Sequence, residues 1–131
     1  MVSIEIMAAT QHNPSVDRGR TLSKATFRAA QLLGLTQAEL APVLGLSRAT
    51  VSRMAAGAYP LSEGQKSWEL AALFVRLFRS LDALVGSKDN QAQAWLNSEN
   101  TALGAAPRQL ISKAEGLVSV VHYLDAARGR I

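Results

Sequence analysis

The chain has 131 residues, of which 48% are apolar and 18% charged, which excludes an intrinsically disordered protein and is enough for one packed domain or two small ones. It has no cysteine, which excludes disulfides and thiolate metal sites, and its two histidines are too far apart to predict a metal site. The formal net charge of +4 favours a polyanionic partner.

The sequence predicts neither a membrane span nor a secretion signal. The apolar run from Leu70 to Phe78 is too short to cross a bilayer and is interrupted by Arg76. The N-terminus lacks the basic start and the apolar core of a signal peptide. We therefore expect a cytoplasmic protein without a membrane partner.

Residues 1–20 contain turn-forming residues without a helical period, which predicts a flexible N-terminal arm. Val2, Ile4 and Ile6 alternate with polar residues, so a short strand against a partner is the alternative. A helix is then expected from Thr21 or Ser23 to about Leu33.

Residues 35–57 carry the pattern of two short helices joined by a tight turn. Thr36 and Glu39 have the spacing of a capping box, which predicts that the first helix begins at the next residue after Thr36. Gly45 is expected to end this helix, because glycine adopts a positive φ without strain. Ser47 then predicts the N-cap of the second helix.

In the second of these helices, Val51 and Met54 are three residues apart and are expected to point inward together. The remaining face carries small, hydroxylated and basic side chains. These suit the major groove, where arginine binds guanine or phosphate, hydroxyls bind base edges or phosphate oxygens, and methyl groups contact thymine. The predicted DNA-binding residues are Gln37, Ser47, Arg48, Ala49, Thr50, Ser52 and Arg53, with the two arginines as anchors.

Gln37, Ala41, Gly45 and Val51 match the fixed positions of the Xre/Cro type of helix-turn-helix, which this segment resembles. The resemblance implies a dimer that places its second helices in successive major grooves of an inverted repeat. Pro42 departs from the pattern, because a proline inside a helix removes one backbone hydrogen bond, and it predicts a kink or a late helix start. An ordinary αα-corner with a solvated basic face is the alternative.

The stretch from Ala58 to Pro60 blocks helix continuation and predicts a domain boundary. From about Glu63 to Val85, apolar residues recur at steps of three and four, which predicts a long helix with a wide apolar stripe. This stripe is buried either within its own domain or partly in a dimer or partner interface. It consists of Leu70, Phe74, Leu77, Leu81 and Leu84, widened by Trp68, Leu73 and Phe78.

Shorter helices are expected after this long one. Gly86 should end it, and Ser87 should cap a short helix through Leu96. Pro107 suits a first helical turn. The remaining signals predict a final helix: Ser112 and Glu115 form a second capping-box pattern, the helix ends at Arg128, and Gly129 takes a left-handed C-cap.

We therefore predict an all-α fold in three parts. These are a flexible arm (residues 1–20), a helix-turn-helix DNA-binding domain (residues 21–60) and a helical domain (residues 61–131).

The helical domain also resembles a known family. The segments LFRSLDAL at 77–84, WL at 95–96, EGL at 115–117, LDA at 124–126 and RGR at 128–130 are similar to the toxin-binding domain of the Xre/MbcA/ParS antitoxins. The order of the two domains is also that of the family. Glu99 stands where the family would have proline, which leaves the shape of that loop open.

The resemblance implies an antitoxin of a type II toxin–antitoxin pair. Its partner is most often a RES-domain toxin that degrades NAD, and the C-terminal end of the antitoxin blocks the toxin's nucleotide pocket. Arginines flanking a glycine at a free end could occupy a phosphate site or pair with a toxin carboxylate, whereas the alternative is a frayed basic end that complements the helix dipole. The predicted toxin-binding residues are Tyr123, Arg128, Gly129, Arg130 and Ile131.

Two functions from different classes follow. The first is an antitoxin that also represses its own operon, acting without a cofactor as a homodimer or as a higher oligomer with the toxin. The second is a stand-alone transcription regulator whose C-terminal domain dimerises or senses a small molecule. An enzyme is not expected, because the sequence has no glycine-rich phosphate loop, no nucleophile with a base and no cluster of metal ligands.

Overall fold

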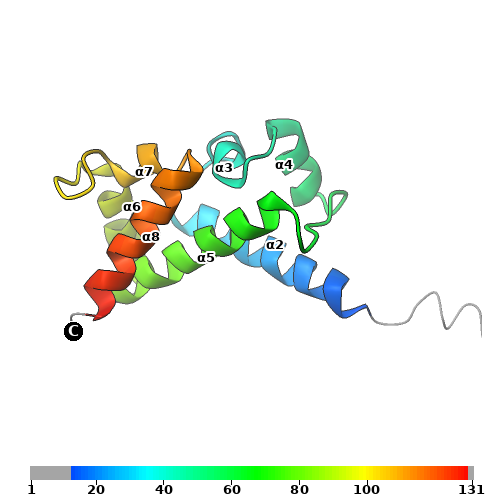
Figure 1. Cartoon of the computed structure of the whole chain (residues 1–131), viewed down its shortest axis with the longest axis horizontal. Coiled ribbons are helices and arrows are strands. Elements are labelled where there is room, and N and C mark those ends of the chain that lie inside the picture. Colours follow the sequence, from blue (N-terminus) through cyan, green and yellow to red (C-terminus); the bar gives the residue numbers. More distant parts are fainter. Residues whose placement is uncertain (1–12, 130–131) are drawn as a thin grey trace, which may run out of the picture.

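The computed structural model describes residues 13–129, and its regular structure there is entirely helical (Figure 1). The expected all-α fold is confirmed. None of the described helices is long and apolar enough to cross a membrane. The helices are α2 (Pro14–Leu32), α3 (Gln37–Leu44), α4 (Arg48–Ala55), α5 (Lys66–Leu84), α6 (Asp89–Asn97), α7 (Pro107–Leu110) and α8 (Ala114–Gly129).

Helix α2 begins at Pro14, inside the segment predicted to be an arm. Asn13 caps it, because its Oδ1 accepts hydrogen bonds from the amides of Ser15 (3.0 Å) and Val16 (3.4 Å), and Pro14 suits the first turn. The prediction of an arm was therefore wrong for residues 13–20: the Asn-Pro pair starts a helix and does not break one. The alternating Val2, Ile4 and Ile6 lie outside the described residues.

Helix α5 lies at the centre of the molecule, where it packs against α2, α3 and α8 (Figure 1). Phe74 and Leu77 have no exposed surface and Leu81 has 1%, which confirms the middle of the predicted stripe. Leu84 is 37% exposed, so the stripe ends before it. A single cluster of buried side chains extends from Ala29 in α2 to Leu124 in α8, so both halves of the chain share one core.

The turn after α5 differs from the expectation. Gly86 follows the end of α5, as predicted, and has a φ of 63°, but Ser87 also has a positive φ, of 61°. The Ser87 amide donates to the Asp82 carbonyl (2.9 Å) and its hydroxyl to the Asp82 carboxylate (3.0 Å). Ser87 therefore closes α5, and Lys88 is the N-cap of α6 without a capping side chain.

The ends of α8 also differ from the prediction. Ser112 donates its hydroxyl proton to the Gln109 carbonyl (2.9 Å), which closes the turn after α7, and α8 begins at Ala114. The predicted capping box is therefore not the start of this helix. At the other end, Gly129 is the last residue of α8 and its φ is not in the left-handed region. The prediction of Pro107 in a first helical turn is confirmed, because it opens α7.

Gly116 sets how closely α7 approaches α8. A Cβ atom at this position would lie 1.9 Å from the carbonyl oxygen of Leu110, which is backbone and cannot rotate away. Gly116 is buried, and its neighbour Leu117 has no exposed surface. Only glycine allows this crossing.

We expect Gly116→Ala to lower the free energy of unfolding by at least about 2 kcal/mol, because the added methyl group overpacks a contact with rigid backbone. Urea denaturation measures this loss. Ser119→Ala, at an exposed position of the same helix, is the control and should change the stability by less than about 0.5 kcal/mol. Equal stability of the two variants would mean that α7 and α8 can separate without cost.

Candidate functional sites

The turn between α3 and α4 is built as the sequence predicts. The Thr36 side chain accepts from the Glu39 amide (3.2 Å) and the Glu39 carboxylate accepts from the Thr36 amide (3.0 Å), which completes the capping box. Gly45 follows with a φ of 67°, and Ser47 caps α4 by accepting from the Thr50 amide (3.1 Å). These local bonds fix the angle between the two helices.

Pro42 does not delay the start of α3, which begins at Gln37. The proline is exposed, and its carbonyl accepts from the Gly45 amide (3.2 Å). The late start that Pro42 predicted is therefore wrong, because the capping box determines where the helix begins and lies a full turn before the proline.

Helix α4 presents a polar face to solvent. Val51 and Met54 are buried as predicted, with 0% and 4% of their surface exposed. The Thr50 hydroxyl oxygen accepts from Ser47 (2.8 Å) and from Arg53 (3.1 Å), so three predicted DNA-binding side chains form one hydrogen-bonded row. Arg48, Ala49, Ser52 and Arg53 are exposed on α4, and Gln37 is exposed at the start of α3.

Arg108 in α7 connects the C-terminal half of the chain to the helix-turn-helix through Glu39 of α3. Its guanidinium binds the second carboxylate oxygen of Glu39 (Nε, 2.8 Å), the carbonyl of Gly34 (3.2 Å) and the side chain of Asn97 (3.0 Å). One carboxylate oxygen of Glu39 therefore completes the capping box with Thr36, and the other oxygen binds Arg108. The sequence carries no signal for this pairing, because the partners are 69 residues apart.

The end of α8 is held against α5. Arg128 donates to the hydroxyl of Ser80 (3.1 Å), a residue without exposed surface, and this hydroxyl donates to Asp125 (3.3 Å). Asp125 also forms an ion pair with Arg76. Sequence reasoning missed Arg76, Ser80 and Asp125, which together fix the position of Arg128.

The other predicted toxin-binding residues have different surroundings. Tyr123 is partly buried and stacks on Trp95 of α6, with ring centroids 6.1 Å apart and an interplanar angle of 26°. Gly129 ends α8, and Arg130 and Ile131 lie outside the described residues. In residues 13–129, no three histidine, aspartate or glutamate side chains gather where they could hold a metal ion.

Comparison with protein families assigns both parts of the chain. Residues 14–76 match the antitoxin Xre-like helix-turn-helix domain, and residues 80–130 match the antitoxin Xre/MbcA/ParS C-terminal toxin-binding domain. The first match ends within α5, so this helix carries part of each matched range. No curated protein sequence matches the chain.

The bonds from the Thr36 amide and then from Arg108 lower the pKa of Glu39 below 4.5, although partial burial opposes the shift. Because the folded pKa is the lower one, the ionised carboxylate stabilises the fold above the unfolded value. This stabilisation is lost as the pH falls through the folded pKa. We expect Glu39→Gln to cost about 1 kcal/mol or less at pH 7, since the pair is partly exposed, and less below pH 4.5.

Thermal unfolding of the Glu39→Gln variant and the parent between neutral and acidic pH measures this effect. Ser119→Ala, an exposed and non-titratable position of α8, is the control and should leave the pH dependence of stability unchanged. If the difference in melting temperature between the parent and Glu39→Gln stayed constant with pH, a stabilising charge at Glu39 would be contradicted.

Proposed function

We propose that this protein, which belongs to the Xre/MbcA/ParS antitoxins, neutralises a RES-domain toxin by blocking its active site with the C-terminal end and represses its own operon through α4. The two matched domains show an antitoxin with a DNA-binding and a toxin-binding domain. The observation that carries the proposal is that one chain joins both domains in this order.

For DNA, we propose that the exposed face of α4 enters the major groove. The Ser47 hydroxyl caps α4 and donates to the Thr50 hydroxyl oxygen, which also accepts from Arg53. This row of hydrogen bonds holds Arg53 in place. Arg48 and Arg53 then make the contacts with guanine or phosphate. Two copies are needed to read an inverted repeat, with α4 helices about one turn of DNA apart.

For the toxin, we propose that Arg130 and Ile131 enter the nucleotide pocket and that Arg128 positions them. The bond from Arg128 to the buried Ser80 holds the last turn of α8 on α5, so the end of the chain leaves from a fixed point. A guanidinium supplied there suits a pocket that binds phosphate groups. Tyr123 stacks on Trp95 and supports α8, so it contributes to toxin binding less directly.

Both partners can be bound at once in this arrangement. Helix α4 and the C-terminal end of α8 lie at opposite ends of the molecule (Figure 1). A toxin on the C-terminal end therefore leaves the exposed face of α4 accessible. We propose that the complex with toxin still binds the operator.

Arg53→Ala should weaken operator binding by about 1–3 kcal/mol, and if Arg53 binds a phosphate the salt slope should fall by about one. Affinity measured at several salt concentrations gives both values. Arg79→Ala, at an exposed arginine of α5 away from α4, is the control and should leave both unchanged. Unchanged affinity and salt dependence for Arg53→Ala would contradict the assignment of α4.

A chain that ends after Ala127 should fail to neutralise the toxin, because it lacks the proposed blocking residues and their anchor, but should still bind operator DNA. Growth and cellular NAD during co-expression with the toxin measure neutralisation. A chain that ends after Gly129 keeps the Arg128 bond to Ser80 and isolates the contribution of Arg130 and Ile131. Full protection by the chain that ends after Ala127 would rule out the blocking model.

Co-expression with the adjacent gene distinguishes this proposal from a stand-alone regulator. We expect the neighbour to encode a RES-domain protein, to arrest growth alone, and to co-purify with this chain. A chain that represses its promoter but binds no such neighbour would support the regulator.

A further inference from the structure

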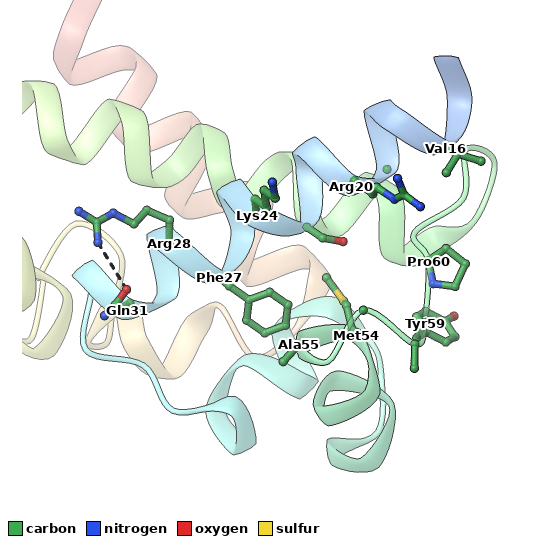
Figure 2. Close-up of a pocket in the computed structure, with 14 residues that line it drawn as sticks. Val16, Arg20, Lys24, Phe27, Arg28, Gln31, Met54, Ala55, Tyr59 and Pro60 are labelled. Carbon is green, nitrogen blue, oxygen red and sulfur yellow. Dashed lines mark hydrogen bonds between the residues drawn. The ribbon is translucent and has the colours of Figure 1, made fainter. Parts of the chain in front are cut away.

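A groove of about 900 Å³ lies between α2 and the segment from the end of α4 to Pro60 (Figure 2). Its apolar surface comes from Phe27 of α2, Met54 of α4 and Tyr59 of the following loop, with Val16 and Pro60 at the end where α2 begins. Val16 is 41% exposed, the largest fraction for any large apolar side chain among residues 13–129. This volume suits a short peptide or a small ligand.

The rim of the groove is cationic. Arg20, Lys24 and Arg28 follow one another at steps of four along α2, so they lie on one face of the helix. Within residues 13–129 none of the three forms an ion pair, and no carboxylate lines the groove; Arg28 contacts Gln31 (3.5 Å). A second copy of the same groove is therefore a poor occupant, because the two rims would repel each other.

The N-terminal sequence combines apolar residues with a carboxylate, which the groove lacks. Residues 2–6 of the segment VSIEIM (residues 2–7) alternate apolar side chains with polar ones, and one of the polar residues is Glu5. In an extended conformation, Val2, Ile4 and Ile6 share one face and Glu5 lies on the other. Apolar side chains could thus cover the floor while Glu5 reaches a rim cation.

Chain length and attachment make this segment the best candidate. The groove opens beside Val16, close to where the N-terminal residues join α2 at Pro14. Along α2, Lys24 lies about 15 Å from Pro14, because a helix rises about 1.5 Å per residue. About five residues in an extended conformation span this distance. Because a short tether gives a millimolar effective concentration, weak contacts are enough for docking.

We propose that residues 2–7 dock in the groove of their own chain, with Ile4 and Ile6 against Phe27 and Met54 and with Glu5 against the cations of α2. The docked segment would cover the exposed apolar surface beside α4. The proposal depends on neither the toxin nor the operator.

Disulfide trapping tests the proposal, because the chain has no cysteine of its own. The full-length variant Ile4→Cys, Ala55→Cys places one thiol on the proposed inward face and one on an exposed residue of the groove. We expect an intramolecular disulfide to form at least about tenfold faster than in the matched control Ser3→Cys, Ala55→Cys, whose first thiol points away. Non-reducing electrophoresis follows the reaction. Ala55 tolerates cysteine because it is exposed.

Charge reversal gives a second, independent measurement. Glu5→Lys should slow the trapping of Ile4→Cys, Ala55→Cys, and adding Lys24→Glu should restore the rate. Equal rates for the Ile4 and Ser3 pairs would overturn docking and leave the groove to an outside partner. A disulfide that forms only between two chains would overturn the intramolecular proposal in favour of an exchanged segment.

Discussion

Burial of α5 is the constraint on which the rest of the structure depends. Phe74 and Leu77 have no exposed surface, and they pack in a cluster that also contains residues of the helix-turn-helix and of α8. This arrangement explains why the first matched family range ends within α5 and the second begins near its end. The helix is a shared rigid element, and it holds α4 and the C-terminal end of α8 at a fixed separation.

The features that the sequence predicted well are those determined by a few neighbouring residues. Thr36 and Glu39 complete their capping box, Gly45 takes a positive φ, and Ser47 caps α4, because each interaction closes within four residues. The long apolar stripe of α5 was predictable for the same reason. Some local signals were nevertheless misread. Asn13 and Pro14, for example, begin a helix instead of breaking one, because a capping side chain and an N1 proline favour that start.

Contacts between distant segments could not be predicted from spacing. Nothing in the sequence around Arg108 shows that it binds Glu39, and the bonds among Ser80, Asp125 and Arg128 depend on how α8 crosses α5. These contacts change the interpretation of the site. Arg128, which the sequence suggested as a toxin-binding residue, donates a hydrogen bond to Ser80 of α5. This contact is the reason why we propose a positioning role for Arg128.

The shared core also affects how the protein would respond to a protease. A protease that unfolds either half must break the packing of α5, which supports the other half. We therefore expect no degradation intermediate in which the helix-turn-helix stays folded without the rest of the core. We also expect the DNA-binding and toxin-binding activities to decay with one half-life.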